Sequence, residues 1–335
     1  MKIFITGATG YLGEQLTKKL LTQGHTICAL IRSPKKAAQL AQPPNVELYE
    51  GDLLQPDKIR KAMQGCEQAY HLAAYAKVRS KDPHTFYKIN VEGTRNVLEA
   101  AKAQEVKKIV VTSTAGVLGP AVNGVVHEES PLAIPLSTDY EKTKLPSEKE
   151  IQKYVAAGLN AVIVNPTRVY GPGQLSESNA TTKLIHQYTT GKWRFLPGDG
   201  QSVGNYVYIE DVVAGHCLAM EKGKAGERYI LGGENASFQK FFQTIREVTS
   251  VSYQLYQLPI WLMMAFAKIQ RWRANTFGKP PLITPPFVRR YLYNWVLSTE
   301  KAERTLGYQP TALKTGIRKT VDWLEENKNL VSLEH

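Results

Sequence analysis

Tyr140 and Lys144 are the two side chains in this sequence whose types and spacing best suit acid–base chemistry. A spacing of four residues puts the phenol and the ammonium on one face of a helix. A phenol titrates at about pH 10 when isolated, so it needs help to exchange a proton at neutral pH. A nearby cation favours the phenolate, and we therefore expect a lowered pKa for Tyr140.

The context of this pair carries the prediction, because Tyr-x-x-x-Lys by itself is common on exposed helices. A loop rich in proline, serine and aspartate precedes Tyr140, which is typical of a helix start. Residues 108–112 predict a buried strand that runs into Ser113 and Thr114. A hydroxyl from Thr114 could hold a substrate oxygen while Tyr140 transfers its proton.

A phosphate cradle is predicted at the N-terminus. Residues 2–6 are apolar and β-branched, as in a buried parallel strand, and residues 14–21 have helical periodicity. Between them, Gly7 permits a tight turn, Gly10 lets the backbone approach a pyrophosphate, and Gly13 allows close packing of helix on strand. Free N–H groups at the helix start would then hold the anion. We interpret this unit as a dinucleotide site; the alternative is a loop that needs its glycines only for geometry.

The residues after the second predicted strand, 25–31, bear on which dinucleotide binds. A free ribose 2′-hydroxyl is usually met here by Asp or Glu, whereas a 2′-phosphate is met by Arg. The sequence has no acid at this point and supplies Arg32, Ser33, Lys35 and Lys36. It therefore favours NADP(H) over NAD(H). In the alternative interpretation, this is an exposed basic loop without a role.

Two later strand ends complete the predicted cofactor site. After the third strand, the Asp52 carboxylate could accept a hydrogen bond from the adenine amine while Leu53 packs on the ring; the alternative is a helix cap. After the fourth strand, residues 68–72, the small side chains of Ala73 and Ala74 let a cofactor lie over the end of the sheet.

Strands and helical segments alternate along the first half of the chain, which predicts an α/β fold with a Rossmann-type doubly wound parallel sheet. We expect residues 1–170 to form the dinucleotide-binding domain. Residues 171–330 should form a smaller α/β C-terminal substrate lobe, interleaved with the first domain through one strand that returns to the main sheet. A long helix is expected from residue 85 to residue 102, with Gly93 closely packed.

Composition argues against several classes of function. The chain of 335 residues has a net charge of +12, and residues 251–299 contain no Asp or Glu. No arginine-rich run accompanies this excess, so we expect no nucleic-acid partner. The three cysteines lack metal-ligand spacing, which argues against a metal site and fits a reducing compartment.

A strand that starts at residue 2 predicts that no signal peptide is present. The longest apolar run, 258–267, is too short to span a bilayer, and we expect a cytoplasmic protein.

Residues 258–273 predict an apolar helix that becomes basic and aromatic. Three interpretations remain open. The helix lines an apolar substrate pocket, which would suit an aromatic or polycyclic substrate. It lies on a membrane surface as an interfacial helix. It is ordinary core or a subunit contact, as in a homodimer. The side chains concerned are Trp261, Met263, Met264 and Phe266.

Six short motifs follow one another along the chain: Gly7-Ala-Thr-Gly10-Tyr-Leu-Gly13, Gly51-Asp52-Leu53, Asn90-Val-Glu-Gly-Thr94, Thr112-Ser-Thr-Ala-Gly116, Tyr140-x-x-x-Lys144 and Asn165-Pro-Thr-Arg-Val-Tyr-Gly-Pro172. In this order they resemble the extended short-chain dehydrogenase/reductases. The similarity covers residues 1–175 and continues more weakly to about residue 325.

The resemblance implies that Thr114, Tyr140 and Lys144 form a catalytic trio, with Thr in a position more often filled by Ser. Ser113 is the adjacent alternative, but neighbouring strand residues face opposite ways and the family register favours Thr114. The resemblance also implies that Asn90 is a fourth member, which keeps a water near the lysine. Lys144 would also hydrogen-bond to the nicotinamide ribose. An oxidised nicotinamide ring would add to the effect of the Lys144 ammonium in lowering the pKa of Tyr140. The residues expected to bind the cofactor are Gly7, Thr9, Gly10, Tyr11, Leu12, Gly13, Arg32, Asp52, Leu53, Ala73, Ala74, Tyr140, Lys144, Pro166, Arg168 and Val169.

Within the family, the sequence looks most like the dihydroflavonol 4-reductase branch, which uses NADPH to reduce a ketone or aldehyde. We therefore expect an NADP(H)-dependent oxidoreductase for an apolar ketone, aldehyde or secondary alcohol. The alternative is a nucleotide-sugar epimerase or dehydratase that retains its cofactor; the arginine that this branch usually carries is missing from residues 204–211. A cofactor sensor without catalysis is a third interpretation, which the presence of the trio argues against.

Overall fold

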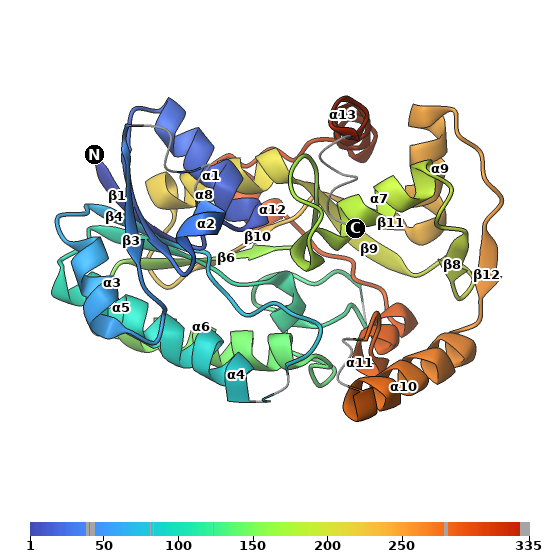
Figure 1. Cartoon of the computed structure of the whole chain (residues 1–335), viewed down its shortest axis with the longest axis horizontal. Coiled ribbons are helices and arrows are strands. Elements are labelled where there is room, and N and C mark those ends of the chain that lie inside the picture. Colours follow the sequence, from blue (N-terminus) through green and yellow to red (C-terminus); the bar gives the residue numbers. More distant parts are fainter. Residues whose placement is uncertain are drawn as a thin grey trace.

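A parallel sheet forms the centre of the molecule (Figure 1). The computed structural model describes residues 1–37, 40, 44–80, 82, 84–122, 124–277 and 281–328. Within these residues, seven strands pair in the order β10-β6-β5-β4-β1-β2-β3, and every pairing is parallel. The strands are β1 (Lys2–Thr6), β2 (Thr26–Ile31), β3 (Val46–Glu50), β4 (Gln68–His71), β5 (Lys108–Thr112), β6 (Ala161–Pro166) and β10 (Arg228–Leu231).

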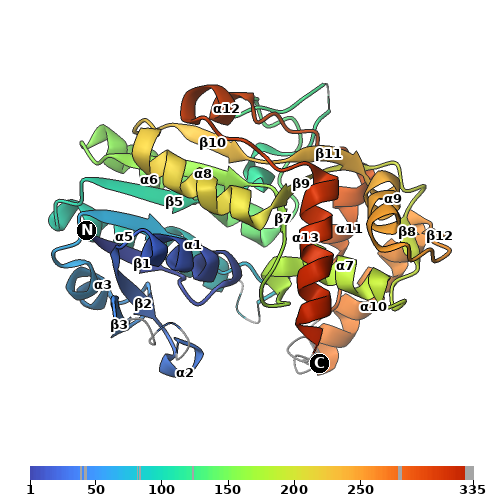
Figure 2. The same ribbon diagram turned by 90° about the horizontal axis from the view of Figure 1, so that it is seen from above.

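Helices cover both faces of this sheet, as Figure 2 shows from above. On one face lie α1 (Tyr11–Thr22), α8 (Ile209–Lys222) and α12 (Glu300–Leu306); on the other lie α3 (Pro56–Met63), α5 (Gly93–Ala103) and α6 (Asp139–Ala156). The strand order reverses at β1, whose neighbours are β2 and β4. In a doubly wound sheet, ligands bind outside the carboxyl ends of the strands at such a reversal. The predicted fold class is confirmed.

A smaller α/β lobe lies beside the carboxyl ends of the strands (Figure 2). It contains a three-stranded sheet, β11-β9-β7, and a two-stranded sheet, β12-β8, with an aromatic core in which Tyr206 stacks on Phe241 at 4.5 Å between ring centroids. Its elements are β7 (Arg168–Tyr170), α7 (Ala180–Thr189), β8 (Phe195–Pro197), β9 (Val203–Tyr208), β11 (Glu234–Ser237), α9 (Phe238–Thr249), β12 (Tyr256–Leu258), α10 (Ile260–Phe277), α11 (Pro285–Arg289) and α13 (Leu313–Glu326).

The chain crosses between the two parts more than once. Strand β10 belongs to the main sheet, although β9 and β11, which flank it in sequence, belong to the lobe. The last two residues of the predicted lobe, 329 and 330, lie outside the described residues. No helix in the described part of the chain is both long and apolar enough to cross a membrane. The remaining short helices are α2 (Pro34–Ala37), α4 (His84–Tyr87), η2 (Ala115–Leu118), η3 (Glu177–Asn179) and η4 (Arg290–Leu292).

The single long helix predicted for residues 85–102 is interrupted. Between α4 and α5 the backbone forms a π-helical turn, η1 (Lys88–Glu92). The Asn90 side chain in this turn hydrogen-bonds to both the N–H and the C=O of Tyr75. Helical periodicity in the sequence does not reveal this contact between distant residues. Gly93 is closely packed, as predicted: a Cβ on it would lie 2.9 Å from the Leu53 Cβ.

Candidate active site

A cleft of about 1820 Å³ opens at the carboxyl ends of β1, β4, β5 and β6. Residues of the lobe close its other side, among them Thr284, Phe287 and Arg290. Most of the predicted site residues line it, and they are Gly7, Thr9, Gly10, Tyr11, Leu12, Gly13, Arg32, Asp52, Leu53, Ala73, Ala74, Thr114, Tyr140, Pro166 and Val169. Asn90, Lys144 and Arg168 are not part of the lining.

The loop between β1 and α1 has the geometry of a phosphate cradle. Gly7 has a left-handed φ of +79°, and its carbonyl accepts a 2.9 Å hydrogen bond from the Gly10 N–H. A Cβ on Gly13 would lie 2.0 Å from the Gly7 oxygen, and one on Gly7 would lie 2.7 Å from the Ala73 nitrogen. Backbone therefore fills the space that side chains would need.

The start of helix α1 is left open for an anion. Gly10 precedes the helix and has no side chain to cap it, so the first N–H groups face the cleft without a side-chain acceptor. The positive end of the helix dipole lies at the same point. These are the groups that a dinucleotide pyrophosphate requires, and the cradle fits such a cofactor.

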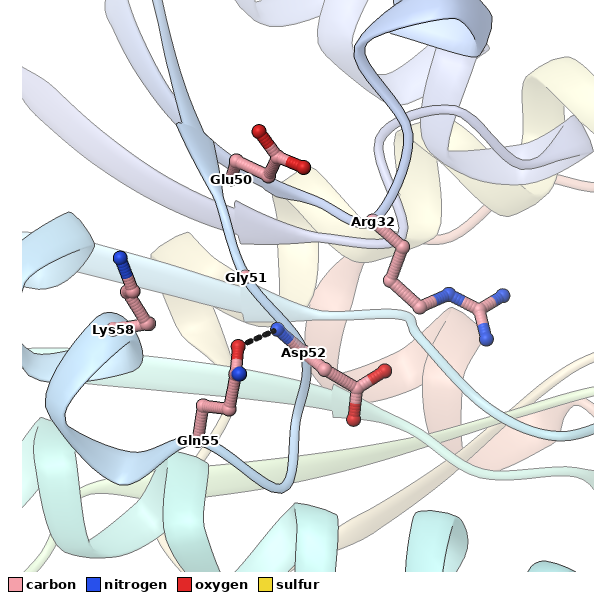
Figure 3. A pocket seen from close by; sticks show the side chains of 6 residues that line it. All are labelled: Arg32, Glu50, Gly51, Asp52, Gln55 and Lys58. Atoms are coloured by element: carbon pink, nitrogen blue, oxygen red, sulfur yellow. Dashed lines mark hydrogen bonds between the residues drawn. The ribbon is translucent and has the colours of Figure 1, made fainter.

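A smaller pocket of about 390 Å³ adjoins the cleft beyond β2 and β3 (Figure 3). The side chains of Arg32 and Asp52 extend to the same side of the loop that follows β3, whereas those of Glu50 and Lys58 point elsewhere. The Asp52 carboxylate accepts from the Leu54 N–H at 3.0 Å. The Gln55 side chain accepts from the Asp52 N–H at 3.0 Å. These two bonds fix the loop that carries Asp52, and Arg32, which follows β2, borders the same pocket.

Tyr140 reaches the cleft from the first turn of α6, which begins at a complete capping box between Thr138 and Glu141. Its ring is partly buried, and the surrounding protein raises the pKa of Tyr140 to about 12 because it removes water from the phenolate. The expected lowering is therefore wrong for the protein without cofactor. Desolvation dominates, and the ammonium that was expected to offset it is engaged elsewhere.

Lys144 lies one turn further along α6 and is buried, with 1% of its surface exposed. Its Nζ donates a 2.9 Å hydrogen bond to the backbone oxygen of Thr112, at the end of β5. Burial lowers the pKa of Lys144 to about 8, and the nearby Glu148 carboxylate partly opposes this shift. That carboxylate is itself paired with Arg228 at 2.8 Å. Lys144 thus holds α6 against the end of β5, and Thr114 lies two residues after the bonded Thr112.

Two hydroxyls follow β5 and line the cleft. Thr114 is partly exposed, and its Oγ1 accepts from the Gly116 N–H at 3.1 Å, which leaves the hydroxyl proton free to be donated outward. Ser113 is buried, with 4% of its surface exposed, and its Oγ has no hydrogen-bond partner in the described structure. Both side chains border the cleft, so the alternation of strand residues does not by itself exclude Ser113.

Asn90 lies behind the cleft wall. Its Oδ1 accepts from the Tyr75 N–H at 2.7 Å, and its Nδ2 donates to the Tyr75 oxygen and to the Thr143 hydroxyl. Asn90 therefore joins the loop after β4 to helix α6, between Tyr140 and Lys144. Its structural role is to position these elements.

Arg168 does not reach the predicted cofactor site. Its guanidinium lies over the rings of Tyr206 and Phe238, at 5.4 and 5.2 Å from their centroids, and donates to the Tyr206 hydroxyl. Because β7 turns into the lobe sheet, every second side chain faces the lobe core, and Arg168 is one of these. Arg168 is therefore not part of the cleft wall, whereas Pro166 and Val169 are.

Helix α10 does not line the cleft with its apolar side chains. Met263 is buried against α11, and Trp261 and Phe266 are exposed to solvent. Arg271 is the residue of this helix, within its described part, that borders the cleft. The interpretation of α10 as a pocket wall built from its apolar residues is therefore wrong.

An ion pair between Arg290 and Glu141 closes the cleft at the side of the lobe, and sequence reasoning missed it. The Glu141 side chain is 3% exposed and also accepts from the Thr138 N–H. The Arg290 guanidinium stacks on Trp295 at 4.0 Å from the ring centroid. The only signal in the sequence was that residues 251–299 contain no Asp or Glu. A cation buried in this segment therefore has to pair with an acid from another part of the chain.

The geometry agrees with the comparison of the chain to known proteins. The pattern of the NAD dependent epimerase/dehydratase family matches residues 3–232. The chain belongs to this family. It is therefore an extended short-chain dehydrogenase/reductase, as the motifs predicted, and an NAD(P)-dependent enzyme of the oxidoreductase type.

Similar proteins of the family differ in the chemistry that their names state. Sterol demethylase protein B of Methylococcus capsulatus is 32% identical over 97% of this chain and 99% of the relative. A Synechocystis protein named as a candidate dihydroflavonol 4-reductase is 30% identical over 97% and 94%. The structure of UDP-glucuronic acid 4-epimerase from Bacillus cereus in complex with NAD is 26% identical, with a TM-score of 0.77 and coverage of 97% and 99%.

We expect the ion pair between Arg290 of the lobe and Glu141 of α6 to couple the stability of the lobe to that of the main sheet domain. Arg290→Gln leaves the Glu141 carboxylate buried without its cation, and we expect the free energy of unfolding to fall by about 3 kcal/mol. Glu141→Gln keeps an oxygen for the capping box, so the double variant should recover about 1–3 kcal/mol of that loss. Urea unfolding of the four proteins measures the coupling, and strictly additive losses would contradict the pair.

Proposed function

We propose that this protein is an NADP(H)-dependent oxidoreductase that interconverts a ketone or aldehyde and the corresponding alcohol of an apolar substrate. The observation that carries this proposal is that the Tyr140 phenol and the Thr114 hydroxyl line the same cleft as the glycine loop of β1 and α1. A bound nicotinamide cofactor supplies or accepts the hydride at the substrate carbon. The side chains of the protein then have to handle one proton and one oxygen.

Tyr140 is suited to donate that proton in the direction of reduction. With a pKa of about 12 it is fully protonated at neutral pH, and a carbonyl oxygen held by Thr114 would take its proton as the carbon accepts hydride. The Lys144 ammonium, which is bonded to Thr112 in the protein without cofactor, would favour the phenolate left behind once an anionic cofactor keeps it charged, and solvent returns the proton at the end of the cycle. Asn90 contributes by holding the loop after β4 and helix α6 in register.

The preference for NADP(H) is proposed from the small pocket around Arg32. A guanidinium binds a phosphate with paired, charge-assisted hydrogen bonds, and Arg32 borders both this pocket and the main cleft. Among the described residues no ion pair joins Arg32 to the acids of this pocket, Glu50 and Asp52, so its guanidinium is available to a phosphate (Figure 3).

An apolar substrate is proposed from the walls of the cleft away from the glycine loop. These walls carry Val78, Phe86, Ile89, Pro286 and Phe287, which come from the loop after β4, from α4, from η1 and from α11. These apolar side chains would stabilise a hydrocarbon skeleton by removing it from water. The name of the Methylococcus relative, which refers to a sterol, fits the same class of substrate.

The second candidate is an epimerase or dehydratase that regenerates its cofactor, which the likeness to UDP-glucuronic acid 4-epimerase favours. The two functions differ in whether NADPH is consumed. We expect one NADPH oxidised per molecule of apolar ketone reduced, and no turnover of nucleotide sugars. Conversion of a nucleotide sugar without net loss of NADPH would support the second candidate instead.

Tyr140→Phe should separate catalysis from binding. Removal of the hydroxyl takes away the proton donor and leaves the ring in place, so we expect kcat to fall by about 10²–10⁴-fold. The dissociation constant for NADPH, measured by fluorescence titration, should change less than about threefold, because the substitution keeps the ring and the other residues expected to bind the cofactor. Ketone reduction at an undiminished rate would remove Tyr140 from the mechanism.

Arg32→Asp should shift the preference from NADPH towards NADH. We expect the ratio of kcat/KM for NADPH to that for NADH to fall by about 10–100-fold, the value of a hydrogen bond to a charged group. Lys58→Asp is the matched control, because it makes the same change of charge in the same small pocket on a side chain that points away. An equal effect of both variants would show that overall charge, and not Arg32, sets the preference.

A further inference from the structure

Helix α10 presents a large apolar surface to solvent. Trp261 is 71% exposed, Trp272 is 61% exposed and Ile269 is 56% exposed, and Leu262 is exposed as well. Positions 261, 265, 269 and 272 recur at the spacing of a helix and share one side of it. We call this surface, made up of Trp261, Leu262, Ala265, Ile269 and Trp272, the outer face of α10.

The opposite side of the helix accounts for its packing. Met263 and Ala267 are buried and pack with Val288 of α11 in a small apolar cluster, and Ala274 is buried on the same side. Figure 1 shows α10 at the edge of the lobe, beside α11. The fold therefore uses one face of α10 and leaves the outer face uncovered. Two tryptophans on such a face are unusual for a surface that contacts only water.

The charged residues of α10 itself are all positive. Lys268 and Arg273 are exposed, and helical spacing places one on each side of the outer face. Residues 251–299 contain no Asp or Glu, so no acidic side chain of this segment neutralises them. An apolar stripe with a tryptophan near each end and cations on both flanks is the pattern of a helix that lies in the interface of a membrane.

We propose that the outer face of α10 docks this protein on the surface of an anionic membrane. The tryptophan rings would sit at the level of the headgroups, and Lys268 and Arg273 would extend to the lipid phosphates. The helix lies on the bilayer and does not cross it, in agreement with the absence of a spanning helix in the described residues.

A second copy of the chain fits the outer face less well. In a symmetric dimer the same patch meets itself, so Lys268 and Arg273 would approach their own copies. With no carboxylate in residues 251–299, these cations would have no partner from the segment itself, and like charges destabilise a contact. An anionic lipid surface complements both the apolar stripe and its flanks.

Helix α10 carries both the docking surface and one residue of the cleft wall. Arg271 of α10 lines the cleft, and so does Phe287 of α11, which is 39% exposed. Docking would therefore hold this wall of the cleft near the membrane, which would shorten the path of an apolar substrate through water. This consequence rests on the proposed function, whereas the docking itself does not depend on the reaction.

Sedimentation of the full chain with vesicles tests the docking without substrate or cofactor. The probe is phosphatidylcholine vesicles with about 30% phosphatidylglycerol in about 0.1 M salt, compared with phosphatidylcholine alone. Lys268→Glu with Arg273→Glu should lower the partition coefficient about 30-fold, at about fivefold for each cation removed. The control, Lys149→Glu with Arg304→Glu, gives the same net charge on exposed residues of α6 and α12 and should bind nearly as the native protein does.

A second variant tests the apolar part. Trp261→Ser with Trp272→Ser should abolish binding, and in the native protein brominated lipids should quench tryptophan fluorescence. Retained NADPH affinity and circular dichroism show that the variants fold.

Absence of binding by the native protein, equal losses in the patch and control variants, or a native dimer that the tryptophan variant dissociates would each overturn the proposal. Reduction of a water-soluble ketone by the same variants reports separately on the proposed function.

Discussion

The hydrogen bond from the buried Lys144 ammonium to the Thr112 carbonyl holds the candidate site together. It fixes helix α6 to the end of β5, so that Tyr140, one turn earlier, and Thr114, two residues later, face the same cleft. Burial lowers the pKa of this ammonium to about 8. An anionic cofactor in the cleft beside α6 would oppose that shift, because a nearby negative charge favours the protonated form.

Local signals allowed much of this arrangement to be predicted from the sequence. The strand, glycine turn and helix of residues 2–21 each have their own pattern, and together they fix the place of the cradle. The carboxyl ends of parallel strands meet at one edge of a sheet, so the strand ends before Ala73 and Ser113 could be placed together before any contact was known. Gly93 also had a local signal, and its packing on Leu53 agrees with it.

Features that depend on distant parts of the chain could not be predicted. The partner of Glu141 is Arg290, which follows it by about 150 positions, and no periodicity joins them. Arg168 matched a family motif, yet the turn of β7 into the lobe takes its side chain away. Whether the pKa of Tyr140 is raised or lowered depends on how much protein surrounds its ring. The spacing of Tyr140 and Lys144 in the sequence does not reveal this. The aromatic residues of α10 left three interpretations open, and only the tertiary packing shows that Trp261 lies in solvent.

Proton uptake on cofactor binding tests the role of Lys144 most directly. Near pH 8.5 a lysine with a pKa of about 8 is mostly neutral, and a bound anionic dinucleotide should raise that pKa and draw in a proton. Calorimetric titration with NADPH in buffers of different ionisation enthalpy measures this uptake. The account predicts uptake of about half a proton or more in the native protein and none in Lys144→Met. Tight binding with no uptake in the native protein would contradict it.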